Sequence, residues 1–340
     1  MGIFVDTNNT LYTADKDQSR VDIWPAGSIN PVRNITTNLI NPCSIFVTSN
    51  NDIYVDNGQS HQQVDKWISN TNSSVIAMRV NAFCYGLFVD IIGNLYCSVE
   101  SLNSVMKRSF SANANTTIIV AGNGTAGSAS VMLNSPRGIF VNQTFNLYVA
   151  DCGNDRVQRF LLGKLNGTTV AGNGTSNTIS LLCPTGVILD GDGYLFIVDS
   201  QQHRIVAQSQ NGFRCIVGCD VGAGSTAYQL NQPWMLSFDS YGNFYVSDVI
   251  NNRVQKFSLM TQFCSKFNQE IVLIENYSRL RSNTIFVFFK SHLDVSATTT
   301  TDIQTSTINT RSTVGETITS TISANDESYN WLFDTLLSFR

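Results

Sequence analysis

Charged side chains are scarce in this 340-residue sequence, in which Asp, Glu, Lys and Arg make up 14% of the residues. The formal net charge is −4, so the chain lacks the basic footprint that is typical of nucleic-acid binders. Long apolar runs are also missing: Ile285–Phe289 is far shorter than the roughly 18 residues that a membrane-spanning helix needs. We therefore expect no nucleic-acid partner and no transmembrane segment.

Residues for metal or nucleophilic chemistry are equally few. The sequence has three histidines, His61, His203 and His292, and no Cys-x-x-Cys pair. A three-histidine zinc centre would need all three in one place, and His292 follows the repeats described below. There is no G-x-S-x-G motif, and the loops GNGTAG and GNGTS lack the lysine of a phosphate-binding loop. We predict no catalytic residue, no metal and no cofactor, and hence no enzyme.

What the sequence does contain is one phrase repeated six times. Its best copy is residues 136–160, PRGIFVNQTFNLYVADCGNDRVQRF, and clear copies follow at 184–207 and 233–257. Aligned on the small residue that precedes the first apolar run, the six copies start at Gly2, Ser44, Gly86, Gly138, Gly186 and Met235. A fixed period of 40 to 50 residues is the signature of a repeat architecture.

Each copy predicts four short antiparallel strands. Apolar runs of four to six residues alternate with turns rich in Asp, Asn and Gly, such as DGDGYL at 190–195. Four strands per unit of this length form a propeller blade, so we predict an all-β fold, a six-bladed β-propeller over residues 1–260 with blades starting near 2, 44, 86, 138, 186 and 235. Because the chain opens MGIFVD, inside the first copy, we interpret its start as truncated.

The repeated phrase resembles the NHL repeat. The resemblance rests on P-x-G-[IV]-x-[VL]-[DN] followed by N-L-Y-V-A-D-x-x-N-x-R-V-x-x-F, and it covers about residues 2–258. It implies a propeller of a kind found in peptide-amidating lyases, bacterial receptor kinases, TRIM-type RNA regulators and many secreted proteins. The resemblance therefore implies the fold and leaves the activity open.

A pair of opposite charges recurs in four copies. An Asp at the end of the second strand is followed five residues later by an Arg, a spacing that allows a charge-assisted pair across the loop. The pairs are Asp15/Arg20, Asp151/Arg156, Asp199/Arg204 and Asp248/Arg253. Because they recur, we interpret them as structural loop pairs rather than as a ring of ligand-binding charges. Blades two and three lack them.

The chain after residue 260 must complete the ring. Residues 261–295 form an extension in which 270–275 or 284–289 is expected to supply the outer strand of blade six. Residues 296–325 are rich in Ser and Thr and predict a disordered linker, with an O-glycosylated stalk as the alternative. Residues 326–340 have apolar residues at helical spacing, which indicates a short helix or the opening of a further domain.

Eight cysteines leave two interpretations, reduced buried thiols or disulfides in an oxidising compartment. If disulfides form, the blade topology favours the pairs Cys84–Cys97, Cys152–Cys183 and Cys215–Cys219, which leaves Cys43 with Cys264. Nine N-x-[ST] glycosylation acceptors are compatible with a secreted glycoprotein, although chance alone gives a similar number. We expect an extracellular protein, with a cytoplasmic one as the alternative.

The function that these features favour is a non-catalytic interaction scaffold, a monomeric propeller that binds a protein or glycan partner. The loops between second and third strands and between blades would meet on one face. The candidate partner-binding residues are Asn123, Thr125, Asn154, Asp155, Asn173, His203, Asn251 and Asn252. The alternatives are a metal-dependent propeller enzyme of the peptide-amidating-lyase type and an RNA-binding or ubiquitin-ligase-associated protein of the TRIM kind.

Overall fold

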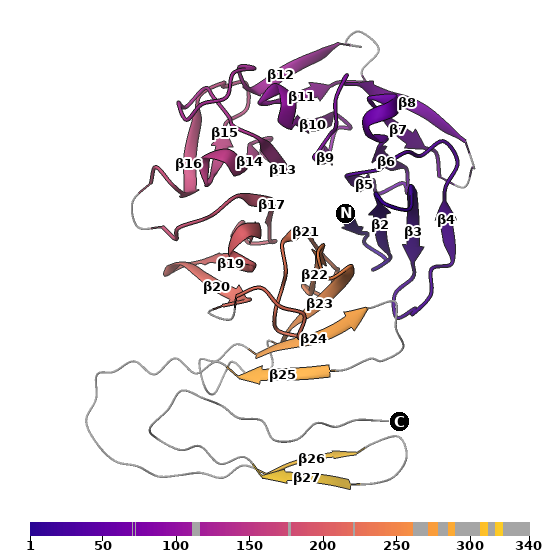
Figure 1. The fold of residues 1–340 in the computed structure, drawn as a ribbon, viewed down its shortest axis with the longest axis vertical. Coiled ribbons are helices and arrows are strands. Elements are labelled where there is room, and N and C mark those ends of the chain that lie inside the picture. Colours follow the sequence, from indigo (N-terminus) through magenta and orange to yellow (C-terminus); the bar gives the residue numbers. More distant parts are fainter. Residues whose placement is uncertain are drawn as a thin grey trace. The chain divides into compact units, whose positions relative to one another are not determined.

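The computed structural model describes residues 1–69, 71, 73–110, 116–175, 178–219 and 222–260, and the backbone of four later strands. The chain divides into two compact units, Met1–Ser291 and His292–Arg340. In the first unit six antiparallel sheets stand side by side around a common axis (Figure 1). This confirms the predicted all-β, six-bladed propeller with blades of four strands.

The first three blades each hold four strands in sequence order. Blade one consists of β1 (Gly2–Val5), β2 (Leu11–Asp15), β3 (Arg20–Trp24) and β4 (Arg33–Ile35). Blade two consists of β5 (Ile45–Val47), β6 (Ile53–Asp56), the short helix α1 (Gly58–His61), β7 (Gln63–Trp67) and β8 (Ser74–Arg79). Blade three consists of β9 (Gly86–Val89), β10 (Leu95–Val99), the 3-10 turn η1 (Glu100–Leu102), β11 (Ser104–Arg108) and β12 (Thr117–Gly122).

The last three blades follow the same order, and the sixth is wider. Blade four consists of β13 (Pro136–Val141), β14 (Leu147–Asp151), η2 (Cys152–Asn154), β15 (Arg156–Phe160) and β16 (Gly167–Gly172). Blade five consists of β17 (Pro184–Leu189), β18 (Leu195–Asp199), η3 (Ser200–Gln202), β19 (Arg204–Ser209) and β20 (Gly212–Val217). Blade six consists of β21 (Pro233–Phe238), β22 (Phe244–Asp248), β23 (Arg253–Met260), β24 (Ile271–Tyr277) and β25 (Ile285–Phe289).

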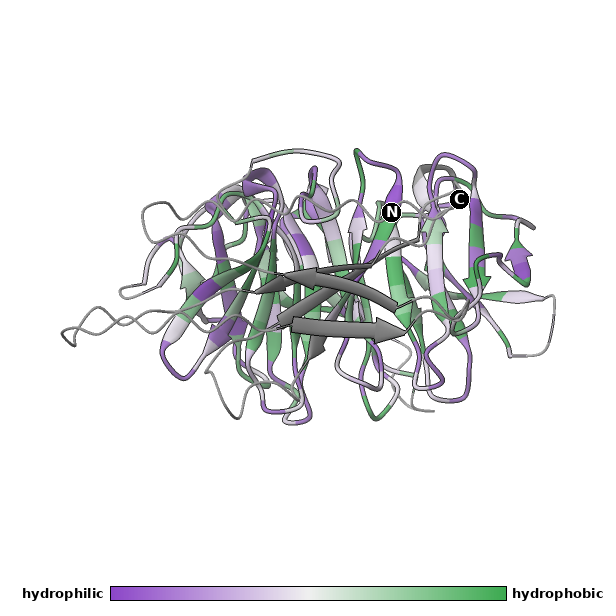
Figure 2. Ribbon diagram, turned by 90° about the horizontal axis from the view of Figure 1, so that it is seen from below, coloured by the Kyte–Doolittle hydropathy of each residue, from purple (hydrophilic) through white to green (hydrophobic). Residues whose placement is uncertain are grey.

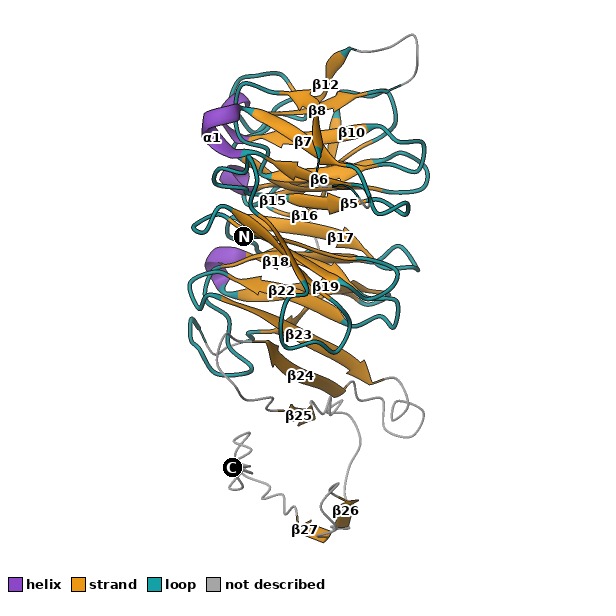
Figure 3. Cartoon of the chain, turned by 90° about the vertical axis from the view of Figure 1, so that its right-hand side faces the viewer, coloured by secondary structure: helices purple, strands orange, loops and turns teal. Residues whose placement is uncertain are grey.

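The propeller has two chemically different faces. We call the side that carries the connections between second and third strands, and between blades, the loop face. The opposite side carries the hairpins between first and second strands and is called the turn face. The short helices lie on the loop face, along one edge of the molecule in Figure 3. Apolar strands fill the space between the two faces, and the connections at both edges are more polar (Figure 2).

Apolar side chains pack between neighbouring blades, and the same packing closes the ring. Between blades six and one, Ile3 and Val5 belong to one buried cluster with Tyr245 and Val254. The backbone N–H of Val5 also donates to Ser237 Oγ at 2.9 Å. The first strand of blade one therefore packs directly against the first strand of blade six, and this contact closes the ring.

The first strands of neighbouring blades approach each other too closely for a side chain. A Cβ atom built on Gly138 would lie 2.6 Å from the carbonyl oxygen of Thr185 in blade five. A Cβ on Gly86 would lie 2.6 Å from the carbonyl oxygen of Arg137 in blade four. Such distances cannot be tolerated without moving the backbone, so these repeated glycines are required by the packing around the axis.

In blade six the fourth place is filled from the segment after residue 260. β24 pairs antiparallel with β23, from Val254 opposite Tyr277 to Met260 opposite Ile271, and β25 pairs with β24. In the second unit the structure describes one hairpin, β26 (Thr307–Arg311) paired with β27 (Thr317–Thr321), which the sequence did not predict. The rest of 296–325, and the expected helix within 326–340, lie outside the described residues.

Buried ion pairs hold the loop face of the last three blades. Arg253 Nε lies 2.7 Å from Asp248 Oδ2, and its two Nη groups donate to the carbonyl oxygens of Ser225, Thr226 and Gln229. Asp248 Oδ1 accepts from the backbone N–H of Asn231 at 2.7 Å. The pair therefore fixes the connection between blades five and six to the loop that follows the second strand of blade six.

The equivalent pairs Asp151/Arg156 and Asp199/Arg204 have the same geometry, with Nε to Oδ2 distances of 2.8 Å. In blade one the structure gives Arg20 a partner that the sequence analysis did not predict. Its Nε lies 2.9 Å from Asp22 Oδ2, because residues two apart in β3 project from the same side of the strand. Asp15 Oδ1 accepts from the backbone N–H of Gln18 at 3.1 Å.

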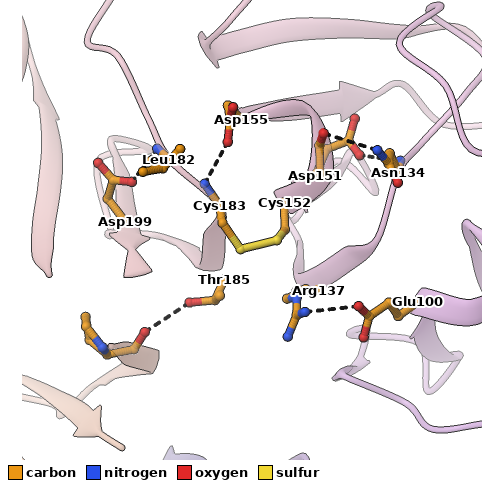
Figure 4. The surroundings of a disulfide bond; sticks show 12 residues. Glu100, Asn134, Arg137, Asp151, Cys152, Asp155, Leu182, Cys183, Thr185 and Asp199 are labelled. Carbon is orange, nitrogen blue, oxygen red and sulfur yellow. Dashed lines mark hydrogen bonds and ion pairs between the residues drawn. A yellow bond between two sulfur atoms is a disulfide. The ribbon is translucent and has the colours of Figure 1, made fainter. Parts of the chain in front are cut away.

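Three of the four predicted disulfides are confirmed: Cys84–Cys97, Cys152–Cys183 and Cys215–Cys219. The second connects blades four and five on the loop face (Figure 4). The prediction for Cys43 is wrong, because Cys43 carries a free, buried thiol, and Cys264 lies outside the described residues. Cys43 precedes β5 on the loop face, whereas the last described residue before Cys264, Met260, ends β23 on the turn-face side of the sheet.

We predict that Gly138→Ala lowers the free energy of unfolding by roughly 1–3 kcal/mol, because its methyl group would overlap the carbonyl oxygen of Thr185. The matched control is Gly191→Ala, because a Cβ there meets nothing within 4 Å and Gly191 has no positive φ. Urea unfolding followed by tryptophan fluorescence measures both. If both substitutions change the free energy of unfolding equally, the close contact between the first strands does not determine stability.

Arg253→Met is expected to cost about 3–5 kcal/mol of unfolding free energy, because it leaves the Asp248 carboxylate buried without its cation. Arg79→Met serves as control, since Arg79 is exposed and makes one long hydrogen bond of 3.5 Å to Gln63. We expect the control to change stability by less than about 0.5 kcal/mol. A small loss for Arg253→Met in the same urea experiment would contradict a structural role for the buried pairs.

Candidate functional site at the axial mouth

The eight loop residues predicted to bind a partner all lie on the loop face, and most of them serve the fold there. Asn154 Nδ2 donates to the Gly127 carbonyl oxygen at 2.9 Å and to Asp151 Oδ2 at 2.8 Å. Asn251 makes the equivalent bonds to Gly224 and Asp248. These two amides therefore complete the buried ion pairs, and their side chains point into the loops.

Two further candidates connect neighbouring blades. Asp155 Oδ1 accepts from the backbone N–H of Cys183 at 2.8 Å (Figure 4). His203 Nδ1 accepts from the backbone N–H of Gln232 at 3.1 Å. Each side chain thus fixes the chain as it enters the next blade, which explains its presence without a ligand.

The remaining candidates are Asn123, Thr125, Asn173 and Asn252, and all four are exposed. Asn123 Oδ1 caps its own turn by accepting from the backbone N–H of Thr125 at 3.0 Å. None of the eight residues lines the pocket described below, and their role in partner binding stays a prediction.

A different group of side chains converges where the axis opens on the loop face. In blades four, five and six the register of the first strand shifts around the small residue of the repeat, between Pro136 and Ile139, between Pro184 and Gly186, and between Pro233 and Leu236. A bulge of this kind changes the direction of a side chain relative to a regular strand. Through these bulges, Arg137 of blade four reaches Trp234 of blade six and Tyr85 of blade three.

We call the five residues Phe83, Tyr85, Glu100, Arg137 and Trp234 the axial cluster. The Arg137 guanidinium carbon lies 4.6 Å from the Trp234 ring centroid and 5.1 Å from that of Tyr85, and these two centroids are 6.0 Å apart, so the cation lies over two rings that contact each other. Its Nη2 donates to Glu100 Oε1 at 3.0 Å (Figure 4). The Phe83 ring lies 6.0 Å from the Tyr85 ring and adds a third aromatic face.

Burial and charge both act on Tyr85. Burial raises the pKa of its hydroxyl to about 12, and the charge of Glu100 together with a hydrogen bond to that carboxylate adds to the effect. The phenol is therefore a neutral donor at physiological pH. With Arg137 on one side and Tyr85 on the other, Glu100 is held in one orientation although a quarter of its side chain is exposed.

A pocket of about 460 Å³ lies against this cluster. It is formed by Phe83, Tyr85 and Glu100 of the axial cluster and by Ser101, Asn103, Ala126, Asn134 and Ser135. Its walls thus come from the segment before β9, from η1, and from the connection between blades three and four. A concave site with aromatic walls and a few fixed polar groups has the composition of a small-ligand pocket.

The axial cluster was not predicted from the sequence, although the repeat contains a signal for it. The residue just before the small residue of each repeat differs in every copy, whereas the positions around it are similar. In order the six are Met1, Cys43, Tyr85, Arg137, Thr185 and Trp234. In a ring, this position of each blade faces the common axis. Its variation from blade to blade therefore indicates that the blades differ at the axial mouth.

Blade two places an acid close to the same region. Asp56, the last residue of β6, is fully buried, and its Oδ1 accepts from the backbone N–H of Cys84 at 3.0 Å. No described residue is hydrogen-bonded to its Oδ2. Burial raises the pKa of this carboxyl to about 7, although backbone hydrogen bonds oppose the shift. Burial and the Asp56 charge likewise raise the pKa of the Cys43 thiol.

Within the described residues, no group of three or more His, Cys, Asp and Glu side chains is arranged to hold a metal ion. No helix in the same part of the chain is long and apolar enough to cross a membrane.

Comparison with solved structures shows similarity of fold at low sequence identity. A protein of unknown function from Bacteroides thetaiotaomicron matches with a TM-score of 0.62 and 15% identity, over 75% of this chain and 68% of the other. An auxiliary nutrient binding protein from the same species matches with a TM-score of 0.59 and 14% identity over the same shares. A streptogramin B lyase matches with a TM-score of 0.56 and 12% identity, over 85% of this chain and 93% of the lyase.

No protein-family model matches the chain, and no curated protein matches it. At these identities the similarity shows the propeller fold and carries no statement about activity.

The buried Asp56 predicts a specific pH dependence. Its native pKa of about 7 exceeds the unfolded value near 3.9, so the native state binds more protons between these values. Its contribution therefore lowers stability as pH rises through that range. Between pH 5 and 8 we expect Asp56→Asn to gain roughly 2–3 kcal/mol relative to the unsubstituted protein. Asp192→Asn, in an exposed turn, is the control. If the free energy of unfolding changes with pH in the same way for Asp56→Asn and for the unsubstituted protein, the pKa of Asp56 is not raised in the native state.

Proposed function

We propose that this chain is a non-catalytic binding scaffold that takes its ligand at the axial mouth of the loop face. The observation that supports this function best is the Arg137 guanidinium, which lies over the adjoining rings of Tyr85 and Trp234, is paired with Glu100, and is placed beside a pocket of about 460 Å³. Aromatic and arginine side chains that are held in place before binding are typical of the residues that dominate binding energies.

The axial cluster is suited to binding because its polar groups are already fixed. Arg137 is held by two rings and by Glu100, and Glu100 by Arg137 and Tyr85. A ligand that contacts this surface does not have to pay for ordering it, which favours affinity. The same arrangement offers no pair of nucleophile and base, which is in keeping with a binding role.

The wider setting agrees with a binding protein outside the cell. The sequence resembles NHL repeats, which occur in many secreted proteins, and one structure with the same fold is a nutrient binding protein. Three disulfides are typical of an oxidising compartment. An enzyme of the lyase type and an RNA-binding protein remain the competing proposals, and the experiment below separates them from the scaffold.

The four tryptophans give a direct test, because Trp234 lies in the axial cluster and Trp67 is buried in blade two. We would record the indole N–H signals by NMR, assign Trp234 with Trp234→Phe, and add in turn pools of neutral glycosides, short peptides and RNA oligonucleotides. We expect at least one of the first two pools to shift the Trp234 signal while Trp67 stays constant. Mass spectrometry should recover that pool unchanged, with or without added Zn²⁺.

Chemical conversion of a pool would support the enzyme instead, and a shift by RNA alone would support the nucleic-acid binder. A pool that binds in calorimetry without moving the Trp234 signal would show that the axial mouth is not the site.

A further inference from the structure

We infer that the pocket beside the axial cluster binds an uncharged sugar ring, the terminal or exposed unit of a neutral glycan. This inference rests on the proposed function and names the ligand of that site. Three properties of the pocket support this inference. It has two aromatic faces, two side-chain amides that each keep one atom free for hydrogen bonding, and one carboxylate that is held by an ion pair.

The aromatic faces come from Phe83 and Tyr85, which are both half-buried and line the pocket. Their ring centroids lie 6.0 Å apart with an interplanar angle of 53°, so the two rings form an angled wall. A pyranose ring presents a face of C–H groups that packs on such a surface, and removing both surfaces from water favours the complex. The C–H face of the sugar ring would therefore pack against this wall.

The two amides are oriented by the backbone. Asn103 Oδ1 accepts from the backbone N–H of Ser135 at 3.1 Å, which leaves its Nδ2 as a donor. Asn134 Nδ2 donates to the Gly153 carbonyl oxygen at 3.1 Å, which leaves its Oδ1 as an acceptor. No hydrogen bond within the described residues occupies either open atom. The pocket thus presents one donor and one acceptor in fixed positions.

Glu100 supplies the third polar group. Arg137 holds its Oε1 at 3.0 Å, and each carboxylate oxygen can accept more than one hydrogen bond. A hydrogen bond from a neutral hydroxyl to an ionised carboxylate is stronger than one between neutral groups. Neighbouring hydroxyls of a sugar could therefore donate to Glu100 while they accept from Asn103.

Other ligand classes fit these walls less well. Among the lining residues only Glu100 and the Tyr85 phenol can ionise, and only Glu100 is charged at physiological pH. A carboxylate or phosphate ligand would therefore face a negative charge. A purely apolar ligand would bury the open atoms of Asn103 and Asn134 without partners. A ligand cation would meet Lys16, whose ammonium already lies 5.6 Å from the Phe83 ring centroid. A hydroxyl both donates and accepts, so a polyhydroxyl ring satisfies every group.

The test uses the full chain and a panel of methyl glycosides of glucose, galactose and mannose, with glucuronate as the charged counterpart. Saturation-transfer NMR detects which sugar protons lie on the protein, and titration gives the dissociation constant. We expect at least one neutral glycoside to bind, with saturation strongest on its ring C–H face, and glucuronate to bind at least fivefold more weakly.

Variants of the pocket make the assignment specific. Phe83→Ala should weaken glycoside binding about tenfold, because it removes one aromatic face, whereas Phe83→Tyr should retain it. Glu100→Gln should weaken binding at least fivefold. The control is Tyr241→Ala, which removes an aromatic ring that is 80% exposed on the turn face and should leave binding unchanged. Thermal melting checks that each variant is folded.

The inference is overturned if no neutral glycoside transfers saturation, if glucuronate binds as well as the neutral sugars, or if folded Phe83→Ala and Glu100→Gln bind as the unsubstituted protein does. The proposed function is judged separately by the Trp234 signal. Peptides that move this signal while sugars do not would keep the scaffold and reject the sugar. A silent Trp234 signal with every pool would reject both.

Discussion

The close approach of the first strands around the axis is the constraint on which the rest of the structure depends. Gly86 and Gly138 each face a backbone carbonyl of the next blade at a distance that admits no Cβ. Blade two solves the same problem differently, because Ser44 occupies the position and its hydroxyl donates to the Cys84 carbonyl oxygen at 2.6 Å. This close approach restricts the position to a small residue in five of the six blades, and the residue just before it directs its side chain to the axial mouth on the loop face in blades three, four and six.

The loop face is rigid where the repeat is best preserved. In blades four to six an Asp–Arg pair fixes each connection to the previous blade, and the Cys152–Cys183 disulfide adds a covalent bond between blades four and five. Blade three lacks the pair, and in its place η1 carries Glu100, which pairs with Arg137 of blade four. The loss of one structural pair is thus accompanied by a contact between blades at the candidate site.

The repeat made the fold predictable, and it also limited what could be predicted about the site. Period, strand pattern and turn residues gave the blades, and strand order gave three disulfides. The axial cluster escaped because Tyr85, Arg137 and Trp234 are far apart in sequence and meet only when the ring closes through bulges that no local pattern indicates. Conversely, the sequence does not reveal that Asn154 and His203 are hydrogen-bonded to backbone groups of neighbouring loops.

The position before the small residue can vary because the fold uses its backbone and not its side chain. The Arg137 carbonyl oxygen covers Gly86 and accepts from Ser98 Oγ, whereas its side chain extends toward Tyr85 and Trp234. Any residue can supply that carbonyl, so the packing constraint does not restrict the chemistry at the mouth. A ring of near-equivalent blades therefore carries a different side chain at this position in each blade. This separation lets propellers of low sequence identity keep one fold while the composition of the axial mouth changes.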